Sequence, residues 1–315
     1  MTPHRIRRTL NRKESRIDLH LDFGAGWMPA DEGSATAPEL GLPRGYTEEF
    51  EFARYEQLGL PHGATVLPVC PLSFRDFMLY ETHAIDAARG MASRFLPAVH
   101  RVASAFESVT RRTFPPFRPN RLWYRQPIYY MSNALTVIPS GTAVRCPSYS
   151  AALDFELELG VVLGSPLRDA TVNEAAAAIA AVVVINDFSA RDVQLAEMRS
   201  GFGPQKSKHF RTSMSDIAVT DATVLDRIAD LTASVQVNGK TVARTSTRAV
   251  RYSVPEAIAH ASRDEQLFPG ELIATGTLPG GSGMELGQWL RPGDRLRLEI
   301  DEVGVIEHHI GEANH

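Results

Sequence analysis

Three carboxylates are spaced two residues apart in one short segment, Asp154-Phe155-Glu156-Leu157-Glu158. Side chains alternate between the two faces of a β-strand, so an extended chain would place Asp154, Glu156 and Glu158 on one face. Neighbouring carboxylates would then lie about 6.6 Å apart, with a repulsion of about 2.5 kcal/mol per pair at an effective dielectric constant of ~20. A hard divalent cation offsets such repulsion, because it binds several carboxylate oxygens at once. The alternative is an exposed strand face with three solvated acids.

The opposite face of this segment is apolar. It carries Phe155, Leu157 and Leu159, and the chain continues as Gly160-Val161-Val162-Leu163-Gly164. A continuous apolar run of this kind is typical of a strand in a packed core. The acidic segment is therefore predicted to be a core strand and not a solvated acidic tract.

A second group of polar side chains follows the apolar run 182–185, in the sequence Asn186-Asp187-Phe188-Ser189-Ala190-Arg191-Asp192-Val193-Gln194. Functional side chains are often presented where a buried strand ends. If a helix begins at Ser189, Arg191 and Gln194 are three residues apart on one face, with Asp187 close by. Lys206 follows after a glycine-containing loop and would add a second cation beside a carbonyl-sized space. The alternative is a capped helix with polar surface residues.

A histidine and an aspartate are paired in the region that precedes these motifs. The spacing of apolar residues predicts a helix from Asp76 to about Arg111, before Pro115-Pro116 ends the segment. Asp76 and His83 are seven residues apart, close to two helical turns, so both would point to one side of that helix. His83 is then a candidate base, although a histidine on a helix is commonly a satisfied structural residue.

The elements that must position these residues are mainly strands. Strands are indicated by aromatic and β-branched residues in 122–144, by an Asn-Gly hairpin in 235–242, and by alternating residues in 295–306. One helix is indicated as well: a capping-box spacing at Thr171–Glu174 precedes an alanine-rich run, which leads into strand 182–185. The sequence therefore predicts a mixed α+β fold with a large, predominantly antiparallel β core.

Composition narrows the functional class. The 315 residues are 43% hydrophobic and 22% charged, as in ordinary globular proteins. The net charge of −4 does not favour nucleic acid as a partner, and no run approaches the ~18 apolar residues of a membrane span. Cys70 and Cys146 form neither a metal-ligand spacing nor a disulfide framework, so we interpret them as buried apolar side chains in a protein of the reducing cytoplasm.

The N-terminal part differs from the rest. The first sixteen residues are basic and lack the apolar stretch of a secretory signal, so we expect an arm, flexible or docked on a neighbouring subunit. Residues 24–45 are rich in Gly, Pro, Ala and acids without a sustained period, which is typical of a loop. We expect residues 1–69 to form this arm and a small irregular subdomain, with a boundary near residue 70.

Taken together, the motifs resemble the fumarylacetoacetate hydrolase family over roughly residues 70–312. The resemblance rests on Asp154-x-Glu156-x-Glu158-Leu159-Gly160-Val161-Val162, on Asn186-Asp187-x-Ser189-Ala190-Arg191-Asp192-x-Gln194, and on Thr275-Gly276-Thr277 followed by Gly283-Met284-Glu285-Leu286. The resemblance implies a catalytic domain over 70–315 with a mixed β-roll or β-sandwich fold and peripheral helices, usually dimeric, which holds a divalent metal through carboxylates.

Position by position, the resemblance implies a role for each candidate residue. The implied metal ligands are Asp76, Glu156, Glu158 and Asp187. These are all oxygen donors, so Mg²⁺ is expected, with Ca²⁺ and Mn²⁺ as alternatives. Asp154 is expected outside the coordination sphere. His83 matches the general base, and Glu285 matches the carboxylate that orients it. Arg191, Gln194 and Lys206 match groups that hold substrate oxygens and developing negative charge, and Tyr130 and Thr277 match substrate contacts.

The implied reaction is hydrolytic cleavage of a carbon–carbon bond in a 1,3-dicarbonyl, acylpyruvate-type substrate such as fumarylacetoacetate. His83 would activate the water, and a small keto acid or β-diketone would be the partner of a homodimer. Two alternatives stay open: an isomerase, decarboxylase or cyclase that enolises a related compound, and a metal-binding scaffold without activity. The loop Pro204-Gln205-Lys206-Ser207-Lys208 departs from the family pattern, and Phe202, Lys208 and Arg211 could change which acyl chain is accepted.

Overall fold

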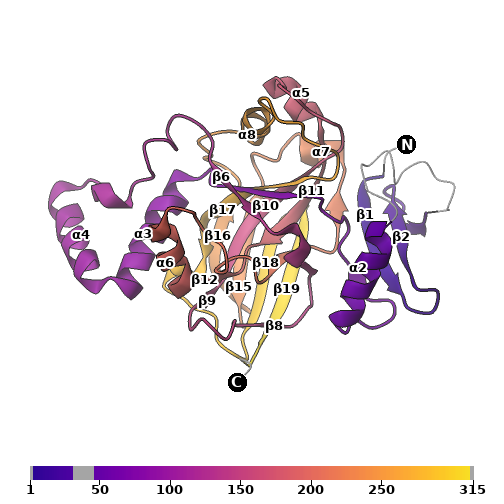
Figure 1. Ribbon diagram of the computed structural model, residues 1–315, viewed down its shortest axis with the longest axis horizontal. Coiled ribbons are helices and arrows are strands. Elements are labelled where there is room, and N and C mark those ends of the chain that lie inside the picture. The colour runs from indigo at the N-terminus through magenta and orange to yellow at the C-terminus, as the bar shows by residue number, and fades with distance from the viewer. Residues whose placement is uncertain (1–2, 31–45, 313–315) are drawn as a thin grey trace.

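The computed structural model describes residues 3–30 and 46–312, and its strands form a central body with helices at the periphery (Figure 1). The predicted loop 24–45 lies mostly outside these residues. Strand β10 (Glu156–Leu163) lies at the centre and pairs antiparallel with β11 (Ile179–Asn186) and β17 (Leu272–Ser282). Every residue of β10 is buried, as the apolar run predicted.

The large sheet joins the first and last thirds of the chain. Its order is β3-β2-β1-β14-β11-β10-β17-β5-β6, with β4, β7 and β13 attached beside this path. The strands not yet given are β1 (Arg5–Asn11), β2 (Arg16–Asp22), β3 (Trp27–Pro29), β4 (Thr65–Val66), β5 (Phe74–Phe77), β6 (Tyr129–Ser132), β7 (Val137–Pro139), β13 (Thr212–Met214) and β14 (Ala218–Val219).

A second sheet packs against one face of β10 and β11. It has the order β16-β15-β18-β19-β8, built from β15 (Thr232–Val237), β16 (Lys240–Ser246), β18 (Arg295–Ile300), β19 (Gly304–Gly311) and β8 (Val144–Arg145). A short pair of strands, β9 (Leu153–Asp154) and β12 (Ser189–Ala190), lies beside the two sheets. The hairpin of β15 and β16 turns at Asn238 and Gly239, both at positive φ, which confirms the Asn-Gly prediction.

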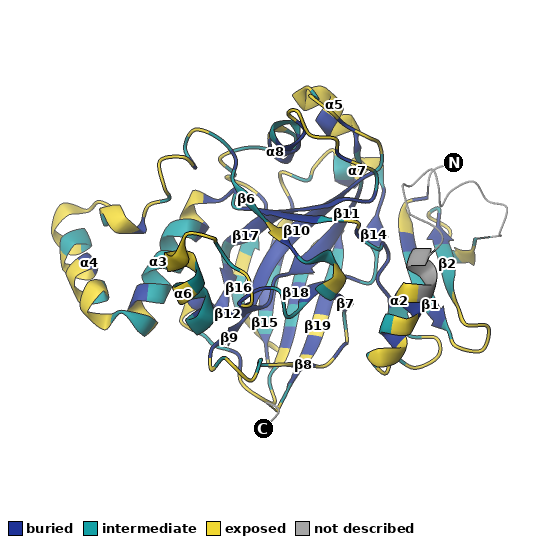
Figure 2. Ribbon diagram, in the orientation of Figure 1, coloured by how far each residue is buried: buried dark blue, intermediate teal, exposed yellow. Residues whose placement is uncertain are grey.

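The core has two layers because the central strands are buried on both faces (Figure 2). Leu157, Leu159 and Val161 of β10 pack with side chains of the second sheet, such as Leu298. Val162 points the other way, into a core that the N-terminal strands complete. A Cβ on Gly160 would lie under 3.0 Å from the side chains of Val183 and Ile185, so only glycine leaves room for their packing.

The helices lie outside the sheets. They are α2 (Tyr46–Gln57), α3 (Glu81–Phe95), α4 (Pro97–Thr110), α5 (Val172–Ala177), α6 (Arg191–Ser200), α7 (Ala222–Leu225), α8 (Val254–Ala261) and α9 (Gly283–Leu286), with 3₁₀ turns at Pro115–Phe117 and Ala134–Thr136. The capping box at Thr171 is present. Within the described parts of the chain, no helix is long and apolar enough to span a membrane.

The predicted single helix from Asp76 to Arg111 is wrong in two respects. Asp76 lies on strand β5, and α3 begins only at Glu81. Pro97 then starts a separate helix, α4, because proline is favoured in a first helical turn and disrupts a helix interior. Asp76 and His83 therefore do not share a helix face.

The basic N-terminal segment is a β-hairpin and not an arm. Strands β1 and β2 pair over their whole length, and β1 also pairs with β14 in the last third of the chain. Ile6 and Leu10 of β1 are buried in the second core layer. The domain boundary near residue 70 stays a prediction. Cys70 and Cys146 are free and only half-buried, which differs from the expected full burial.

Candidate active site

Three carboxylates meet at the ends of the central strands. Asp76 is on β5, Glu158 is on β10, and Asp187 follows the last residue of β11. Strand β17 lies between the strands that carry Asp76 and Glu158. Its Ala274 is paired with Asp76, and its Thr277 is paired with Glu158. One oxygen from each of the three acids lies within 4.8 Å of the others, and all three side chains are buried. We call Asp76, Glu158 and Asp187 the acid cluster.

The acid cluster fits a hard divalent cation. Burial and the neighbouring Asp187 raise the pKa of Asp76 well above its usual range, and burial and Asp76 do the same for Glu158. In addition, Glu158 Oε2 is buried without a hydrogen-bond partner among the described residues. An orphaned buried oxygen and repelling acids are what a cation would satisfy, and the donors are all oxygen, as Mg²⁺, Ca²⁺ and Mn²⁺ prefer.

Glu156 lies beside the acid cluster and faces two cations. Its Oε2 is in direct contact with the Lys208 ammonium, and its Oε1 lies 2.7 Å from Arg191 Nη2. Burial opposes ionisation here, but Arg191 and Lys208 together hold the pKa of Glu156 far below its usual range. Of the four expected metal ligands, the structure thus groups three, while Glu156 is engaged in ion pairs.

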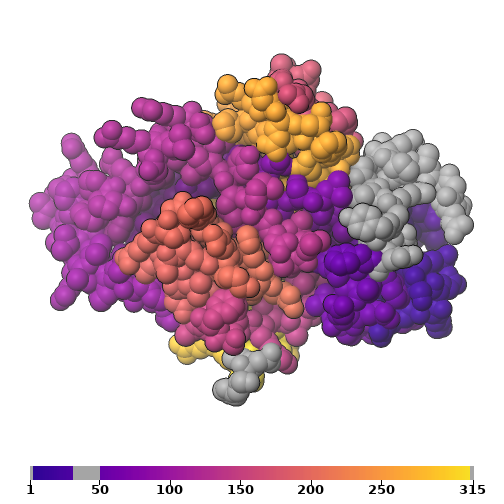
Figure 3. Space-filling model, viewed as in Figure 1, coloured from indigo at the N-terminus to yellow at the C-terminus, as the bar shows by residue number. Residues whose placement is uncertain are grey.

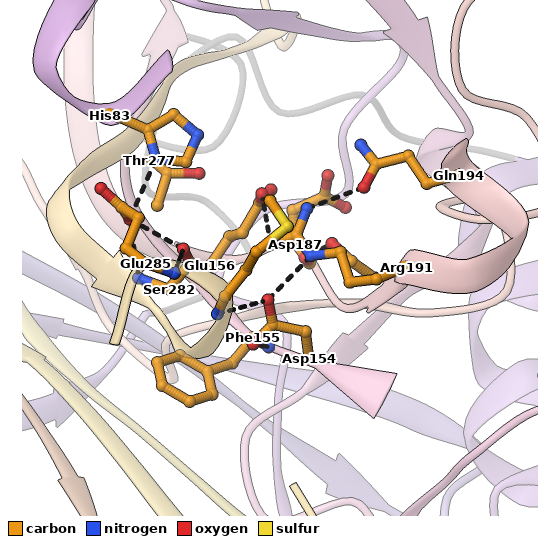
Figure 4. A network of polar contacts seen from close by, with 12 residues as sticks. His83, Asp154, Phe155, Glu156, Asp187, Arg191, Gln194, Thr277, Ser282 and Glu285 are labelled. Atoms are coloured by element: carbon orange, nitrogen blue, oxygen red, sulfur yellow. Dashed lines mark hydrogen bonds and ion pairs between the residues drawn. The ribbon is translucent and has the colours of Figure 1, made fainter. Parts of the chain in front are cut away.

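Asp154 and Arg191 form a buried pair next to Glu156 (Figure 4). Arg191 Nε donates to Asp154 Oδ2 over 2.7 Å, and Asp154 also accepts the backbone N–H of Met284. Arg191 Nη1 donates to Gln194 Oε1 over 2.8 Å, so these two residues share a face of α6 as expected, although the helix begins at Arg191 and Ser189 is part of a strand. Because Arg191 is only 1% exposed, its position favours holding the acidic strand in place over contacting a substrate.

Lys208, and not Lys206, is the lysine at the acid cluster. Lys208 is buried, and its Nζ lies 2.7 Å from Asp187 Oδ2. Lys206 is exposed, and its Nζ lies over the ring of Tyr149, 5.6 Å from the centroid. The loop turns at Ser207, whose hydroxyl donates to Glu197. This turn directs the two lysines to opposite sides of the loop, so the expected role of Lys206 at the site is not supported by its position.

Hydroxyl groups orient the acids of the cluster. Tyr130 Oη donates to Asp187 Oδ2 over 2.6 Å, and Thr212 Oγ1 donates to Asp187 Oδ1 over 3.0 Å. Thr277 Oγ1 lies 3.4 Å from Glu158 Oε1. Tyr130 and Thr277, expected as substrate contacts, are therefore next to the cluster. Thr212 was not anticipated, and nothing in its local sequence distinguishes it.

The histidine and its carboxylate come together as expected. His83 Nδ1 on α3 lies 3.0 Å from Glu285 Oε2 on α9. Glu285 is fixed by Ser282, whose hydroxyl and backbone N–H both donate to it in a capping box, and by the N–H of Gly280. The sequence Ser282-Gly283-Met284-Glu285 has the capping-box spacing, so this anchor was detectable from the sequence. In Figure 4, His83 lies at the upper left with Glu285 below it, and both lie to the left of Asp187 and Arg191.

Comparison with known proteins identifies the family of this chain. The profile described as "Fumarylacetoacetate (FAA) hydrolase C-terminal" matches residues 102–311. The chain belongs to the fumarylacetoacetate hydrolase family. An uncharacterized protein from Pyrococcus horikoshii is 32% identical over 186 residues, which cover 59% of this chain and 78% of that protein. The human mitochondrial oxaloacetate tautomerase is 32% identical over 185 residues, which cover 58% of each chain.

Solved structures of this family share the fold over nearly the whole chain. The fumarylacetoacetate hydrolase of Exiguobacterium antarcticum has a TM-score of 0.67 at 19% identity and covers 98% of this chain and 99% of its own. The 5-carboxymethyl-2-hydroxymuconate delta-isomerase of Mycobacterium smegmatis has a TM-score of 0.66 at 18% identity, with 99% and 100% covered. The fold is therefore the predicted α+β fold, and the solved proteins that share it include a hydrolase and an isomerase.

Proposed function

We propose that this family member is a divalent-metal-dependent hydrolase that cleaves a carbon–carbon bond of an acylpyruvate-type 1,3-dicarbonyl compound. The observation that carries the proposal is the His83–Glu285 pair, which lies close enough to Glu156 for the charge of His83 to lower the pKa of that acid and which would activate water. A metal held by Asp76, Glu158 and Asp187 would polarise the substrate carbonyl groups. We further propose Mg²⁺ as that metal, a homodimer as the assembly and the cytoplasm as the location.

The tautomer of His83 follows from its neighbour. A carboxylate beside Nδ1 favours the proton on that nitrogen, which leaves Nε2 as the acceptor for a proton from water. The anchors on Glu285 hold its carboxylate in place, 3.0 Å from Nδ1 of His83, before substrate binds. The hydroxide formed by this proton transfer would add to the carbonyl carbon of the acyl group.

The ammonium of Lys208 would stabilise the negative charge that develops after this addition. When the carbon–carbon bond breaks, its electron pair forms the enolate of the leaving ketone, and the acyl group leaves as a carboxylic acid. The ammonium of Lys208 is buried next to Glu156 and Asp187, where it can stabilise an oxyanion in a low-dielectric site. Protonation of the enolate carbon completes the hydrolysis.

A second reaction uses the same residues without adding water. The human relative is a tautomerase and a structural neighbour is an isomerase, and both names imply proton transfer at a carbonyl compound. In that case His83 would move a proton between carbon and oxygen, and the product would keep the mass of the substrate. The buried acid cluster and Lys208 would serve either reaction. The two reactions differ in whether a water molecule is added to the substrate.

The deciding experiment is a substrate panel in ¹⁸O-labelled water. Acylpyruvates, fumarylacetoacetate, larger β-diketones and oxaloacetate are incubated with Mg²⁺, Mn²⁺ or a chelator, and products are identified by mass spectrometry. A hydrolase gives two fragments, with one labelled oxygen in the carboxylic acid. We expect His83→Ala to lower this activity ~10²-fold or more, as loss of a general base does, while the exposed His309→Ala has no effect.

The proposal fails in two distinguishable ways. If an isomeric product of unchanged mass forms and no substrate is cleaved, the enzyme is a tautomerase or isomerase. If cleavage by His83→Ala continues at the rate of the native chain while the metal remains bound, then His83 is not the base.

A further inference from the structure

A hollow with a cationic lining lies on the outer side of the loop that carries Lys208. Its volume is about 520 Å³, which is within the range of small-molecule sites. The lining comes from β8 with the residues on either side of it and from the loop before β13, and it includes Arg145, Tyr149, Lys206, Phe210 and Arg211. These two segments lie next to each other on the face shown in Figure 3. We call this hollow the loop pocket.

The charged side chains that line the loop pocket are all positive. Three of its lining residues, Arg145, Lys206 and Arg211, carry positive charge, and none is acidic. The nearby acid Glu197 is already engaged, because it accepts the backbone N–H groups of Gln205, Lys206 and Ser207 as well as the Ser207 hydroxyl. Its carboxylate holds the loop, but its negative charge still reaches the rim of the pocket, because burial and Glu197 together raise the pKa of Tyr149.

Arg211 is the residue best placed to bind an anion. It is half-buried, and the hydrogen bond that the structure gives its guanidinium goes to the carbonyl of Phe210, over 3.2 Å. Burial and the neighbouring guanidinium of Arg54 lower the pKa of Arg211. A partly desolvated guanidinium beside a second cation is stabilised by a carboxylate or phosphate, which accept two parallel N–H donors.

Aromatic side chains form part of the pocket lining. Tyr149 and Phe210 are among its lining residues, and Tyr149 is fixed because its hydroxyl donates to the Lys206 carbonyl over 2.7 Å. A planar body would pack against these rings while its anionic group meets Arg211 and Lys206.

The loop pocket and the acid cluster share one segment of chain. Lys208 and Thr212 contact the acids on the inner side, whereas Lys206, Phe210 and Arg211 line the pocket on the outer side. The sharp turn of the loop produces this division. A ligand in the loop pocket would therefore hold the same segment that supplies Lys208.

We propose that the loop pocket is a second binding site, which takes a small planar organic anion that carries carboxylate or phosphate groups. This inference is independent of the reaction proposed above. Binding is measured by calorimetry on the full chain at constant ionic strength with three probes: isophthalate, inorganic pyrophosphate and neutral isophthalamide. We expect saturable binding of isophthalate and none of isophthalamide. We expect pyrophosphate to bind more weakly than isophthalate, and equally tight binding of pyrophosphate would contradict the planar ligand.

Matched variants locate the site. We expect Arg211→Gln and Lys206→Gln each to weaken isophthalate binding ~10-fold, as the loss of a charge-assisted hydrogen bond does. The exposed Lys240→Gln, which also removes one positive charge, serves as the control, and Glu158→Gln in the acid cluster should leave this binding unchanged. Thermal unfolding of each variant verifies that it folds. The proposal is overturned if isophthalate does not saturate, if isophthalamide binds equally well, or if Arg211→Gln binds like the native chain.

Discussion

Lys208 Nζ lies 2.7 Å from the Asp187 carboxylate, whereas Lys206, two residues earlier, stands over Tyr149 on the other side of the loop. Although burial opposes its charge, Asp187 and Glu156 raise the pKa of Lys208 above its usual value. The ammonium is thus charged at neutral pH and faces the acid cluster. This separation of two neighbouring lysines provides a direct test of the site.

We expect Lys208→Met to lower kcat ~10²-fold or more, because it removes a buried charge that stabilises an oxyanion. Lys206→Met should leave kcat within about twofold, since surface contacts of this kind contribute little. The affinity for a divalent cation, measured by calorimetry, should stay equal or tighten in Lys208→Met, because a competing positive charge is gone. Loss of activity in Lys206→Met alone would contradict the assignment.

The acid cluster predicts metal-dependent stability. At ~100 times its dissociation constant, a bound Mg²⁺ raises the free energy of unfolding by about 2.7 kcal/mol. We expect a chelator, or Glu158→Gln, to abolish this increase in thermal unfolding scans. Asp154→Asn should keep it while lowering the stability of the chain, because Asp154 holds Arg191 and the Met284 N–H. A full metal response in Glu158→Gln would exclude the acid cluster as the binding site.

Much of the local structure could be predicted because it depends on neighbouring residues. The capping box at Thr171, the Asn238-Gly239 turn and the Arg191–Gln194 contact all involve residues within a few positions of each other. Their geometry follows from backbone preferences that the rest of the fold does not override. The apolar run that forms β10 was also predictable, but the predicted strand over 154–158 is interrupted at Phe155, so Asp154 lies on β9 and pairs with β12.

Long-range relationships could not be predicted in the same way. Alternation places Glu156 and Glu158 on one face, but the pairing of β10 with β17 shifts register between them, and they have different partners. Asp76 fits a helical period, yet pairing with β17 makes it part of a strand. The turn at Ser207 places Lys208 inside and Lys206 outside. That turn is held by a hydrogen bond from Ser207 to Glu197, which lies in the preceding helix. Each case depends on contacts that sequence spacing does not encode.

Gly90 predicts a test of how α3 positions His83. A Cβ on Gly90 would lie 2.1 Å from the backbone oxygen of Met284, next to Glu285. Helix propensity alone makes Gly→Ala stabilising by up to ~1 kcal/mol. We expect the opposite here: Gly90→Ala should destabilise by ~1–3 kcal/mol through overpacking and lower kcat by separating His83 from Glu285. The exposed Ser93→Ala on the same helix is the control.

A double-mutant cycle shows whether Gly90 acts through His83. If it does, Gly90→Ala should lower activity in the native chain but not further in the His83→Ala background. Metal affinity should be unchanged in both. Equal losses of activity in the two backgrounds would mean that Gly90 affects the fold generally and not this pair.

His308 predicts how stability depends on pH. It is buried on β19, its Nδ1 donates to the Thr142 carbonyl over 2.7 Å, and burial lowers its pKa from 6.5 to about 4. The unfolded chain therefore binds a proton near pH 6.5, whereas the folded chain binds it only near pH 4. Stability is complete above pH 6.5 and falls as the pH decreases towards 4, by at most about 3 kcal/mol from this residue.

His308→Asn tests this dependence, because the asparagine amide can keep the donor to Thr142 and does not titrate. We expect the variant to be less stable than the native chain at pH 7.5, since it fills less of the core, but to lose less stability between pH 6.5 and 4.5. Urea unfolding at several pH values measures both effects, and His309→Asn on the exposed face of the same strand is the control. An unchanged pH slope in His308→Asn would show that other groups control the acid sensitivity of this protein.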